Sequence, residues 1–316
     1  MSKELKKILF CGLENGGKTS ILLLLDKKFS LLPTVKPTIK AKRTVHTNSL
    51  LGISIIRWDL GGQRSYRKLY IGDKSKYFTE MQSIFYVIDI QTPENFEESL
   101  AFLKDIVAII SSSHPENFQF LILLHKNDPD IKNNKEIIEN ISYFENIIPS
   151  IIRDIKYSIF KTSIYDGPSL LKAFSDGAFY ATHKSNMFQT LLKEYMSKTY
   201  NSSTLLLDQN CFIIASRCTD EDYQRICESI APRLTQALEK LEEWDISTID
   251  IVTNIEFSQK HSNSNKEGII FLRKLDINDT RFYLVALCLN KNVKTKSYEY
   301  LPLLADNLKN LLESFD

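Results

Sequence analysis

Short apolar runs alternate with longer helix-like stretches through the first half of the chain. Five runs are apolar enough to be strands: ILFCGL (8–13), ISIIRWDL (53–60), SIFYVIDI (83–90), FQFLILL (118–124) and YSIFKTSI (157–164). The stretches between them have the spacing of amphipathic helices: 19–29, 93–112, 135–154 and 168–182. Strands with so few polar positions are buried on both faces. The pattern therefore predicts βαβ units in a mostly parallel sheet with helices on both faces.

The pattern changes after about residue 183. A helix leads to the strands STLLLD and CFIIASR, which a turn at Gln209–Asn210 separates. A helix over 220–243 contains Pro232, which should kink or divide it. Three consecutive strands and a helix over 300–315 follow, with HSNSNKEG (261–268) as a polar loop. This order predicts a second, α+β domain with an antiparallel sheet, and hence two domains over 1–182 and 183–316.

Composition narrows the class of protein. The 316 residues include 40 basic and 39 acidic side chains, and a net charge of +1 argues against binding of nucleic acid through bulk charge. No apolar run is long enough to cross a membrane, and neither end carries a lipidation motif. Five cysteines without CxxC spacing indicate reduced core residues. We expect a cytoplasmic protein with no direct membrane anchor.

Glycine is scarce, at 10 of 316 residues, and half of these glycines fall in two clusters. The first cluster lies in Gly12–Thr19, which reads GxxxxGKT between a predicted strand and a predicted helix. Glycines let backbone N–H groups curl around phosphate oxygens, and the helix N-terminus adds a positive dipole. Lys18 would neutralise phosphate charge and Thr19 would ligate Mg²⁺. The motif predicts a phosphate-binding loop.

The second cluster, Trp58–Gln63, reads WDLGGQ at the end of a predicted strand. Asp59 could hold Mg²⁺ through water, Gly62 could donate its N–H to a γ-phosphate, and Gln63 could orient an attacking water. The Pro-punctuated loop between the clusters offers two threonines as a further Mg²⁺ ligand. Thr38 is favoured because its separation from Asp59 suits the intervening loop and strand, and Thr34 remains the alternative.

A candidate base site follows the next strands. Residues 125–128 read HKND after an apolar run, and the carboxylate of Asp128 could accept hydrogen bonds from N1–H and the 2-amino group of guanine. Adenine lacks both donors, so it would leave Asp128 unpaired. Lys126 would pack across the base. The following strand ends at Ser163 and Ile164, where a backbone N–H could bind guanine O6.

These motifs resemble a small GTPase of the Ras superfamily, and more narrowly the Rag/Gtr family. HKxD at 125–128, FKTSIYD at 160–166 and WDLGGQ are similar to the Rag forms of the corresponding motifs. The resemblance implies a P-loop GTPase domain with a six-stranded mostly parallel sheet, followed by a roadblock/longin-like domain. Glu14 departs from it, because an acidic residue in the phosphate loop looks more Arf-like. His125 departs from the NKxD form that is usual in the superfamily.

The resemblance also implies the site residues. Guanine nucleotide would contact Glu14, Asn15, Gly16, Gly17, Lys18, Thr19, Ser20, Thr38, Gly62, His125, Lys126, Asp128, Ser163 and Ile164. Mg²⁺ would be held by Thr19, Thr38 and, through water, Asp59, and Gln63 would be catalytic. Loops 30–43 and 61–78 would order around Mg²⁺-GTP. Arg43, Arg57, Arg64 and Arg67 are expected to be solvated or on strand faces, so that GTP hydrolysis is slow without an activating partner.

The function that follows is a GTP-hydrolysing switch that assembles through its roadblock domain in nutrient-type signalling. The implied partners are a second Rag-like GTPase in a homo- or heterodimer, separate roadblock scaffold proteins, and GTPase-activating and exchange factors. Such partners would recruit it to a membrane. One alternative is a scaffold with a structural nucleotide site that barely hydrolyses GTP. A P-loop ATPase or kinase is a third possibility.

Overall fold

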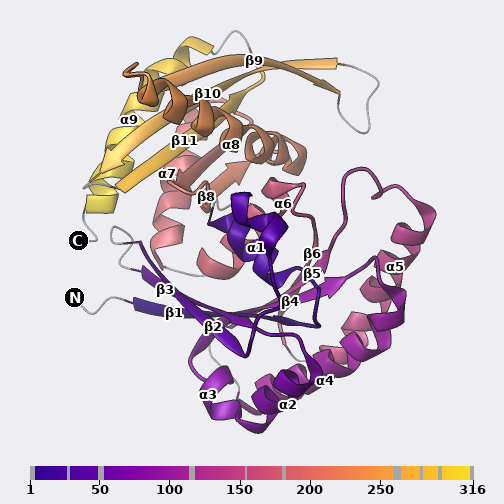
Figure 1. Cartoon of the computed structure of the whole chain (residues 1–316). Coiled ribbons are helices and arrows are strands. Elements are labelled where there is room, and N and C mark those ends of the chain that lie inside the picture. Colours follow the sequence, from indigo (N-terminus) through magenta and orange to yellow (C-terminus); the bar gives the residue numbers. More distant parts are fainter. Residues whose placement is uncertain are drawn as a thin grey trace. The chain divides into compact units, whose positions relative to one another are not determined.

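The computed structural model describes residues 4–26, 29–48, 53–113, 118–153, 155–179, 183–258, 265–277, 280–290 and 294–313. The chain forms two compact units, one within residues 1–180 and one from Ala181 to Asp316. Figure 1 shows the elements of each unit along the chain.

The first unit contains a six-stranded sheet with the order β2-β3-β1-β4-β5-β6. The strands are β1 (Glu4–Gly12), β2 (Ala41–Asn48), β3 (Ile53–Leu60), β4 (Met81–Asp89), β5 (Gln119–His125) and β6 (Tyr157–Thr162). β1, β3, β4, β5 and β6 run parallel, and β2 pairs antiparallel with β3 at the edge. The carboxyl ends of the parallel strands therefore meet along one border of the sheet, where open α/β sheets bind their ligands.

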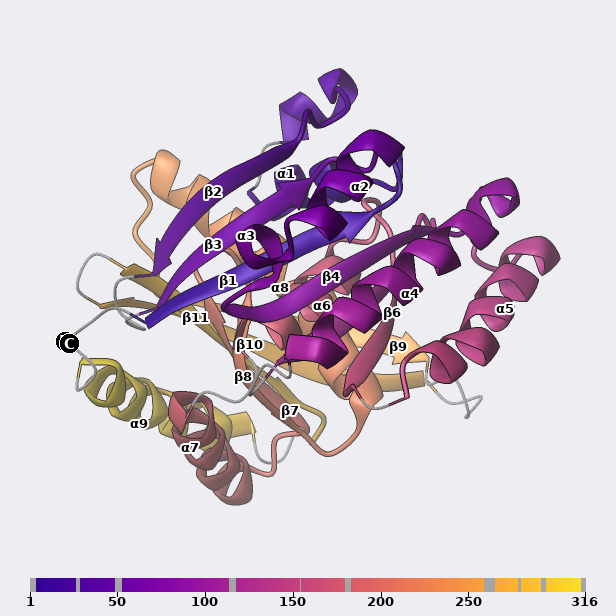
Figure 2. The ribbon, with the colours of Figure 1, turned by 90° about the horizontal axis from the view of Figure 1, so that it is seen from below.

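Helices cover both faces of this sheet (Figure 2). One face carries α1 (Lys18–Leu25) and α6 (Gly167–Phe179), and the other carries α2 (Arg64–Gly72), α3 (Lys74–Phe78), α4 (Phe96–Ser113) and α5 (Lys135–Ile151). Short 3₁₀ turns lie at Phe29–Thr34 and Pro93–Asn95. On the α6 side the rings of Phe10, Phe85 and Phe174 stack.

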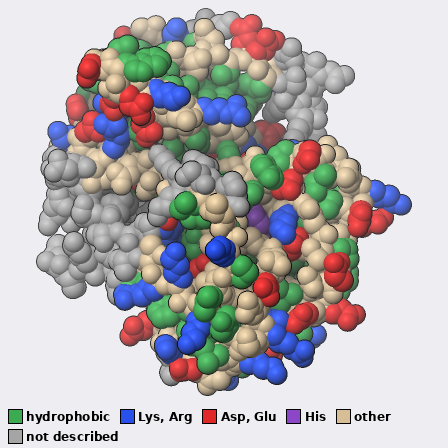
Figure 3. All heavy atoms as spheres, in the orientation of Figure 1, with side chains coloured by type: hydrophobic (Ala, Val, Ile, Leu, Met, Phe, Trp, Pro, Cys, Tyr) green, Lys and Arg blue, Asp and Glu red, His purple; other side chains and the backbone are tan. Residues whose placement is uncertain are grey.

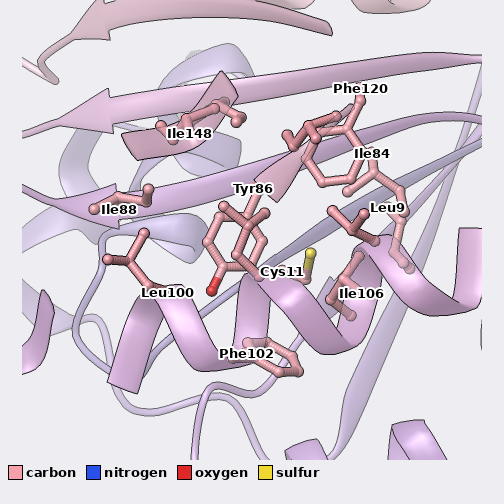
Figure 4. Packing of buried hydrophobic residues seen from close by; sticks show 14 of the residues in the cluster. Leu9, Cys11, Ile84, Tyr86, Ile88, Leu100, Phe102, Ile106, Phe120 and Ile148 are labelled. Carbon is pink, nitrogen blue, oxygen red and sulfur yellow. The ribbon is translucent and has the colours of Figure 1, made fainter. Parts of the chain in front are cut away.

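The face toward α4 and α5 holds the larger core. Leu9, Cys11 and Tyr86 point toward α4 from neighbouring strands (Figure 4). The buried Tyr86 hydroxyl donates to the carbonyl oxygen of Ser99 on α4, 2.7 Å away. A buried hydroxyl with a partner avoids the desolvation cost of an unmade hydrogen bond, so this contact fixes how α4 lies on the sheet.

Three elements of the first unit differ from the sequence pattern. The apolar pattern marked five strands and not β2, because the sequence AKRTVHTN is mostly polar, as is usual for an edge strand; with β2 the sheet has the six strands that the family resemblance implies. Residues 61–78, which were expected as a loop, contain α2 and α3. α1 ends at Leu25 instead of continuing to residue 29, and the backbone N–H of Asp26 closes it by bonding to the carbonyl oxygen of Leu22.

The second unit contains a five-stranded antiparallel sheet with the order β8-β7-β11-β10-β9. The strands are β7 (Ser203–Asp208), β8 (Ile213–Cys218), β9 (Asp250–Ser258), β10 (Asn265–Ile277) and β11 (Thr280–Cys288). The helices are α7 (His183–Thr199), α8 (Glu221–Glu243) and α9 (Lys294–Glu313). Asp208 makes the turn from β7 to β8, since its Oδ1 accepts from the backbone N–H groups of Asn210 and Phe212.

Alternation along the strands assigns the helices to opposite faces of this sheet. Leu205 and Leu207 lie in one core cluster with Cys227 and Leu238 of α8, whereas the ring of Phe271 on the opposite face meets Tyr298 of α9. α7 packs beside α9 (Figures 1 and 2). This is the α+β architecture of the roadblock/longin-like type, with β9 as an edge strand.

Two details of the second unit differ from the sequence pattern. Pro232 does not divide α8, which runs as one helix from Glu221 to Glu243, because the burial of its apolar side on the sheet outweighs the lost hydrogen bond. Residues 265–268 of the expected polar loop belong to β10, and 261–264 lie outside the described residues.

Neither sign of charge dominates the surface that Figure 3 shows, in line with the nearly equal numbers of basic and acidic side chains. Acidic and basic side chains are interspersed on the face drawn in Figure 3. Within the described residues, no helix combines the length and apolar character needed to span a bilayer. All five cysteines are free, and only Cys218 among them is partly exposed.

Candidate functional site

A cavity of about 190 Å³ opens in the first unit beside the end of β1. Its lining comes from three segments: the loop after β1, the stretch before β2, and the loop after β3. The lining residues are Glu14, Asn15, Gly17, Lys18, Thr19, Ser20, Val35, Lys36, Pro37, Thr38, Gly62 and Gln63. The two glycine clusters of the sequence therefore face one space, as the parallel strand order requires.

The loop between β1 and α1 needs glycine at two positions. Gly12 has a φ of 137°, and a Cβ there would lie 2.3 Å from the carbonyl oxygen of Val87. Gly17 has a φ of 91°, and a Cβ there would lie 2.6 Å from Cδ2 of His125. Both backbone conformations are strained for any other residue. The loop thus runs close under β4 and β5 and turns directly into the N-terminus of α1, the geometry that binds phosphate.

Lys18 lies under this loop and is almost fully buried. Its Nζ donates to the carbonyl oxygens of Leu13 at 2.6 Å and Gly12 at 3.2 Å. Burial lowers the pKa of Lys18, while the negative charge of Asp59 works in the opposite direction. Since the bonds of this buried ammonium within the described structure go to neutral carbonyl groups, its positive charge is available for an anion in the cavity.

Thr19, Thr38 and Asp59 come together at one side of the cavity. The Thr19 hydroxyl donates to Oδ2 of Asp59 at 2.7 Å, and the Thr38 hydroxyl donates to the same oxygen at 3.0 Å. The two hydroxyl oxygens are 2.8 Å apart. Thr34 takes no part in this cluster, because its hydroxyl bonds to the carbonyl oxygen of Leu31 within the 3₁₀ turn.

This cluster fits a magnesium ion. Each hydroxyl has one proton, so three short oxygen–oxygen contacts share two protons. The other carboxylate oxygen of Asp59 is buried and has no hydrogen-bond partner among the described residues. A hard cation with oxygen ligands would satisfy all these atoms. In the described part of the chain, no group of three His, Cys, Asp or Glu residues offers an alternative metal centre.

The loop after β3 lies tightly against the phosphate loop. A Cβ on Gly62 would be 2.2 Å from the backbone nitrogen of Glu14, and one on Gly61 would be 2.4 Å from the carbonyl oxygen of Thr38. Gln63 is the N-cap residue of α2, but its side chain does not cap the helix. Its amide Nε2 instead lies 3.5 Å from Oε1 of Glu14. The side chain is therefore directed toward the loop that would hold phosphate.

Asp128 lies at the carboxyl edge of the sheet with both carboxylate oxygens engaged. Ser163 donates its hydroxyl to Oδ1 at 2.5 Å, and Gln91 donates its amide to Oδ2 at 3.0 Å and to the carbonyl oxygen of Lys126 at 2.7 Å. Nζ of Lys126 pairs with Oδ2 of Asp89 at 2.5 Å. These contacts orient one carboxylate and one lysine beside the end of β5.

His125 joins this edge to the phosphate loop. Its buried ring lies against Gly17, and its Nδ1 is 3.0 Å from the hydroxyl oxygen of Thr162. Burial, followed by the charge of Lys126, lowers the pKa of His125 to about 4. The imidazole is thus neutral near pH 7 and acts as a packing and hydrogen-bonding group. Ile164 follows Ser163 at the same edge and is partly buried.

Several residues of the site were not anticipated from the sequence. Val35, Lys36 and Pro37 line the cavity, although only the threonines of that loop had been considered. Gln91 could have been found, since β4 ends at the same edge of the sheet as β5.

Four arginines were expected to be solvated or on strand faces. Arg57 does lie on a strand face, in β3, where it is buried, whereas Arg67 is buried on helix α2. Arg57 pairs with Asp26 and lies over the ring of Phe174, as a strand residue that faces α1 and α6. Arg67 bonds to Gly62 and Glu98. Its burial follows from α2, which the sequence pattern did not predict.

The strand order, the glycine loop between β1 and α1, and the clustered Thr19, Thr38 and Asp59 define the class of protein, a P-loop GTPase of the small G protein type. Residues 7–255 match the family model described as Gtr1/RagA G protein conserved region. The chain therefore belongs to the Gtr1/RagA family of G proteins.

Individual proteins that the chain resembles share less than a third of their aligned residues with it. The GTP-binding protein gtr1 of Schizosaccharomyces pombe is 23% identical over 222 residues, covering 68% of this chain and 69% of that protein. The ADP-ribosylation factor-like protein 3 of Saccharomyces cerevisiae is 30% identical over 149 residues, covering 44% and 71%. The structure of the Arl6 BBS3 small GTPase from Trypanosoma brucei with the nucleotide analogue GppNp is 18% identical, with a TM-score of 0.43, covering 54% of this chain and 94% of that one.

Proposed function

We propose that the chain binds GTP with Mg²⁺ in the cavity of the first unit, hydrolyses it to GDP and phosphate, and so acts as a switch. The observation that supports this proposal most strongly is the cluster of Thr19, Thr38 and Asp59 beside the phosphate loop. Its oxygens come from three separate segments, and the segment of Thr38 is held there by the bond from the Gly61 N–H to the carbonyl oxygen of Lys40, at 2.7 Å. A ligand that bridges these segments would order them together.

The protein's own residues would bind and orient the nucleotide as follows. Backbone N–H groups from Glu14 to Ser20 and the ammonium of Lys18 hold the phosphates. Thr19 and Thr38 would ligate Mg²⁺ directly and Asp59 through water. When bound, Mg²⁺ neutralises charge on the β- and γ-phosphates. Gly62 offers its N–H to the γ-phosphate.

Gln63 would orient the water that attacks the γ-phosphate. No arginine is among the described residues that line the cavity, so Lys18 and the backbone N–H groups are the protein's own groups there that would stabilise the charge developing during phosphoryl transfer, together with bound Mg²⁺. We infer slow intrinsic hydrolysis, which an activating partner accelerates by supplying a further cation. Exchange of GDP for GTP would need a second kind of partner.

Guanine would lie between Lys126 and the carboxylate of Asp128. Ser163 orients that carboxylate, since its hydroxyl bonds to Oδ1. The amide of Gln91 occupies Oδ2, in the manner that a guanine N–H would. A carboxylate accepts from the N–H donors of guanine and finds no such donor on adenine, so we infer selection of GTP over ATP.

Displacement of a fluorescent GDP analogue by unlabelled nucleotides tests this function. GDP and GTP should compete at comparable concentrations, and ATP should compete about 10,000-fold more weakly, as expected of a site that rejects a ligand lacking the required donors. Removal of Mg²⁺ by a chelator should speed nucleotide release. Equal competition by ATP would instead support the ATPase or kinase alternative.

We also propose that the second unit, residues 183–316, is the assembly module that pairs this chain with a second copy or another Rag-like GTPase. The supporting feature is edge strand β9 with the exposed side chains of Ile249 beside it and Val252 on it. Separate roadblock scaffolds could bind the same kind of surface. Such partners would recruit this protein from the cytoplasm to a membrane.

Light scattering of the full chain tests the assembly proposal, alone and mixed with candidate partners. A dimer should form and should be weakened by Val252→Lys. Leu303→Lys, which alters an exposed leucine on α9, is the matched control. A chain that stays monomeric with every partner would contradict the proposal.

One observation favours a second function, that of a scaffold with a barely hydrolytic site. Glu14 engages the amide of Gln63. If this contact persists with GTP bound, Gln63 is unavailable to orient water. The scaffold would then bind guanine nucleotide for structural reasons only.

A further inference from the structure

Arg67 connects the loop after β3 to helix α4. Its Nε donates to the carbonyl oxygen of Gly62 at 2.9 Å, and its Nη2 lies 2.5 Å from Oε1 of Glu98. Only 9% of the residue is exposed. The planar guanidinium is suited to this task, because its N–H groups leave in fixed, divergent directions and can hold two acceptors at once.

Helix α4 provides a receptor for this guanidinium. Glu98 lies in the first turn of α4, where the helix dipole favours a carboxylate. Phe102 follows four residues later on the same side of the helix, and Figure 4 shows its ring on α4. The centroid of this ring is 5.2 Å from the guanidinium carbon of Arg67. The hydrogen bond from Arg67 is the main cause of the lowered pKa of Glu98. One cation thus meets a carboxylate and an aromatic ring.

The held carbonyl belongs to the peptide group that joins Gly62 to Gln63. On its other side Gly62 contacts the phosphate loop, since a Cβ there would overlap with Leu13 and Glu14. Fixing this peptide fixes the start of α2 and the backbone position of Gln63. We propose that Gly62, Arg67 and Glu98 form a latch, in which Arg67 is a positioning residue that stabilises the GTP-bound arrangement of the loop after β3.

The latch rests on the proposed function, in which Gly62 meets the γ-phosphate. GDP lacks that phosphate and gains nothing from a fixed Gly62. A ligand shifts a conformational equilibrium only by its difference in affinity for the two states. Holding Gly62 in the competent position therefore favours GTP over GDP, and coupling to α4 makes that helix part of the switch.

Dissociation rates of two fluorescent nucleotides test the latch in the full chain with Mg²⁺ present. The probes are GDP and the β,γ-imido analogue of GTP, and the variants are Arg67→Ala, Glu98→Ala and the double variant. Each single variant should release the GTP analogue about tenfold faster than wild type, which is the low end of the effect of losing a hydrogen bond to a charged group. Release of GDP should stay within about twofold of the wild-type rate, because GDP does not use the fixed Gly62. The double variant should be no faster than Arg67→Ala, because both changes open one latch.

Two further variants separate the latch from general effects of charge. Arg64→Ala removes an exposed arginine of the same helix and should behave as wild type. Arg67→Lys keeps the charge but loses the two-acceptor geometry, so it should behave as Arg67→Ala. Equal acceleration of both nucleotides, no acceleration, or wild-type behaviour of Arg67→Lys would overturn the latch alone. If wild type itself retained neither nucleotide, the proposed function would be at fault.

Discussion

The hydroxyl oxygen of Thr38 lies 2.8 Å from that of Thr19, although the two residues belong to separate segments. Both hydroxyls donate to one oxygen of Asp59, whose other oxygen is buried and unpartnered within the described structure. These hydrogen bonds of Thr38 hold the loop before β2 at the place where a cation would bind.

Replacing Thr38 with alanine should weaken Mg²⁺-dependent binding of the GTP analogue about tenfold, since it removes one direct metal ligand, while GDP binding changes little. Titrating Mg²⁺ against the fluorescence of the bound analogue measures this change. Thr34→Ala is the matched control, because the Thr34 hydroxyl donates to the carbonyl oxygen of Leu31 in its own turn. If Thr34→Ala had the larger effect, the assignment of Thr38 would be wrong.

The spacing of the motifs was sufficient to predict that the phosphate loop, Asp59 and one threonine of the loop before β2 meet at one edge of a parallel sheet. It could not choose between Thr34 and Thr38, because that choice depends on where the 3₁₀ turn ends. It also missed β2 and α2, whose sequences are polar on one side and short. Their stability comes from tertiary contacts that no local pattern reveals.

The proposed base site at the end of β5 also depends on tertiary contacts that the sequence alone could not predict. HKND placed Asp128 at the end of β5, but its contact with Gln91 required the register between β4 and β5. Arg67 was expected to be solvated or on a strand face, because no sequence motif positions it in the site. Only the position of α4 places a carboxylate and an aromatic ring against it.

Asp128→Asn should exchange the base preference of the site. Xanthine has a carbonyl in place of the 2-amino group of guanine, and the amide N–H of asparagine can donate to it. The same substitution replaces one of the two carboxylate oxygens that accept from guanine. We expect GTP binding to fall and xanthosine triphosphate binding to rise, each by about 100-fold, in the range of a missing hydrogen bond to a charged group. Competition against fluorescent GDP and fluorescent XDP measures both. Unchanged GTP binding would exclude Asp128 from the base site.

Gly17→Ala should weaken nucleotide binding about tenfold or more. The new Cβ would meet the His125 ring at 2.6 Å in a left-handed backbone conformation, so the loop must move. Gly72→Ala is the control, because a Cβ on Gly72 meets nothing within 4 Å. Equilibrium binding of fluorescent GDP compares the two. Equal affinities in both variants would contradict the described loop geometry.

The lowered pKa of His125 predicts a pH-dependent stability. Below about pH 6.5 the unfolded imidazole takes up a proton, whereas the folded one remains neutral until about pH 4. His125 thus destabilises the fold as the pH falls through this window, and has no such effect above it. The loss is about 2 kcal/mol between pH 7.5 and pH 5.

Urea unfolding of wild type and His125→Asn at these two pH values measures this contribution. The stability of the variant relative to wild type should rise by about that amount as the pH falls, because asparagine does not titrate. A constant difference between the two proteins would show that His125 is not buried as a neutral ring.

Single-turnover hydrolysis of GTP by the full chain, with Mg²⁺ present, tests the central claim most directly. The account predicts slow release of the γ-phosphate by wild type and a rate at least about tenfold lower in Gln63→Leu, the effect expected when a water-orienting group is lost. Glu14→Ala should not abolish hydrolysis, because Glu14 contacts Gln63 without a catalytic role of its own. Equal inertness of wild type and Gln63→Leu, with every candidate activating partner, would contradict the switch and support the scaffold.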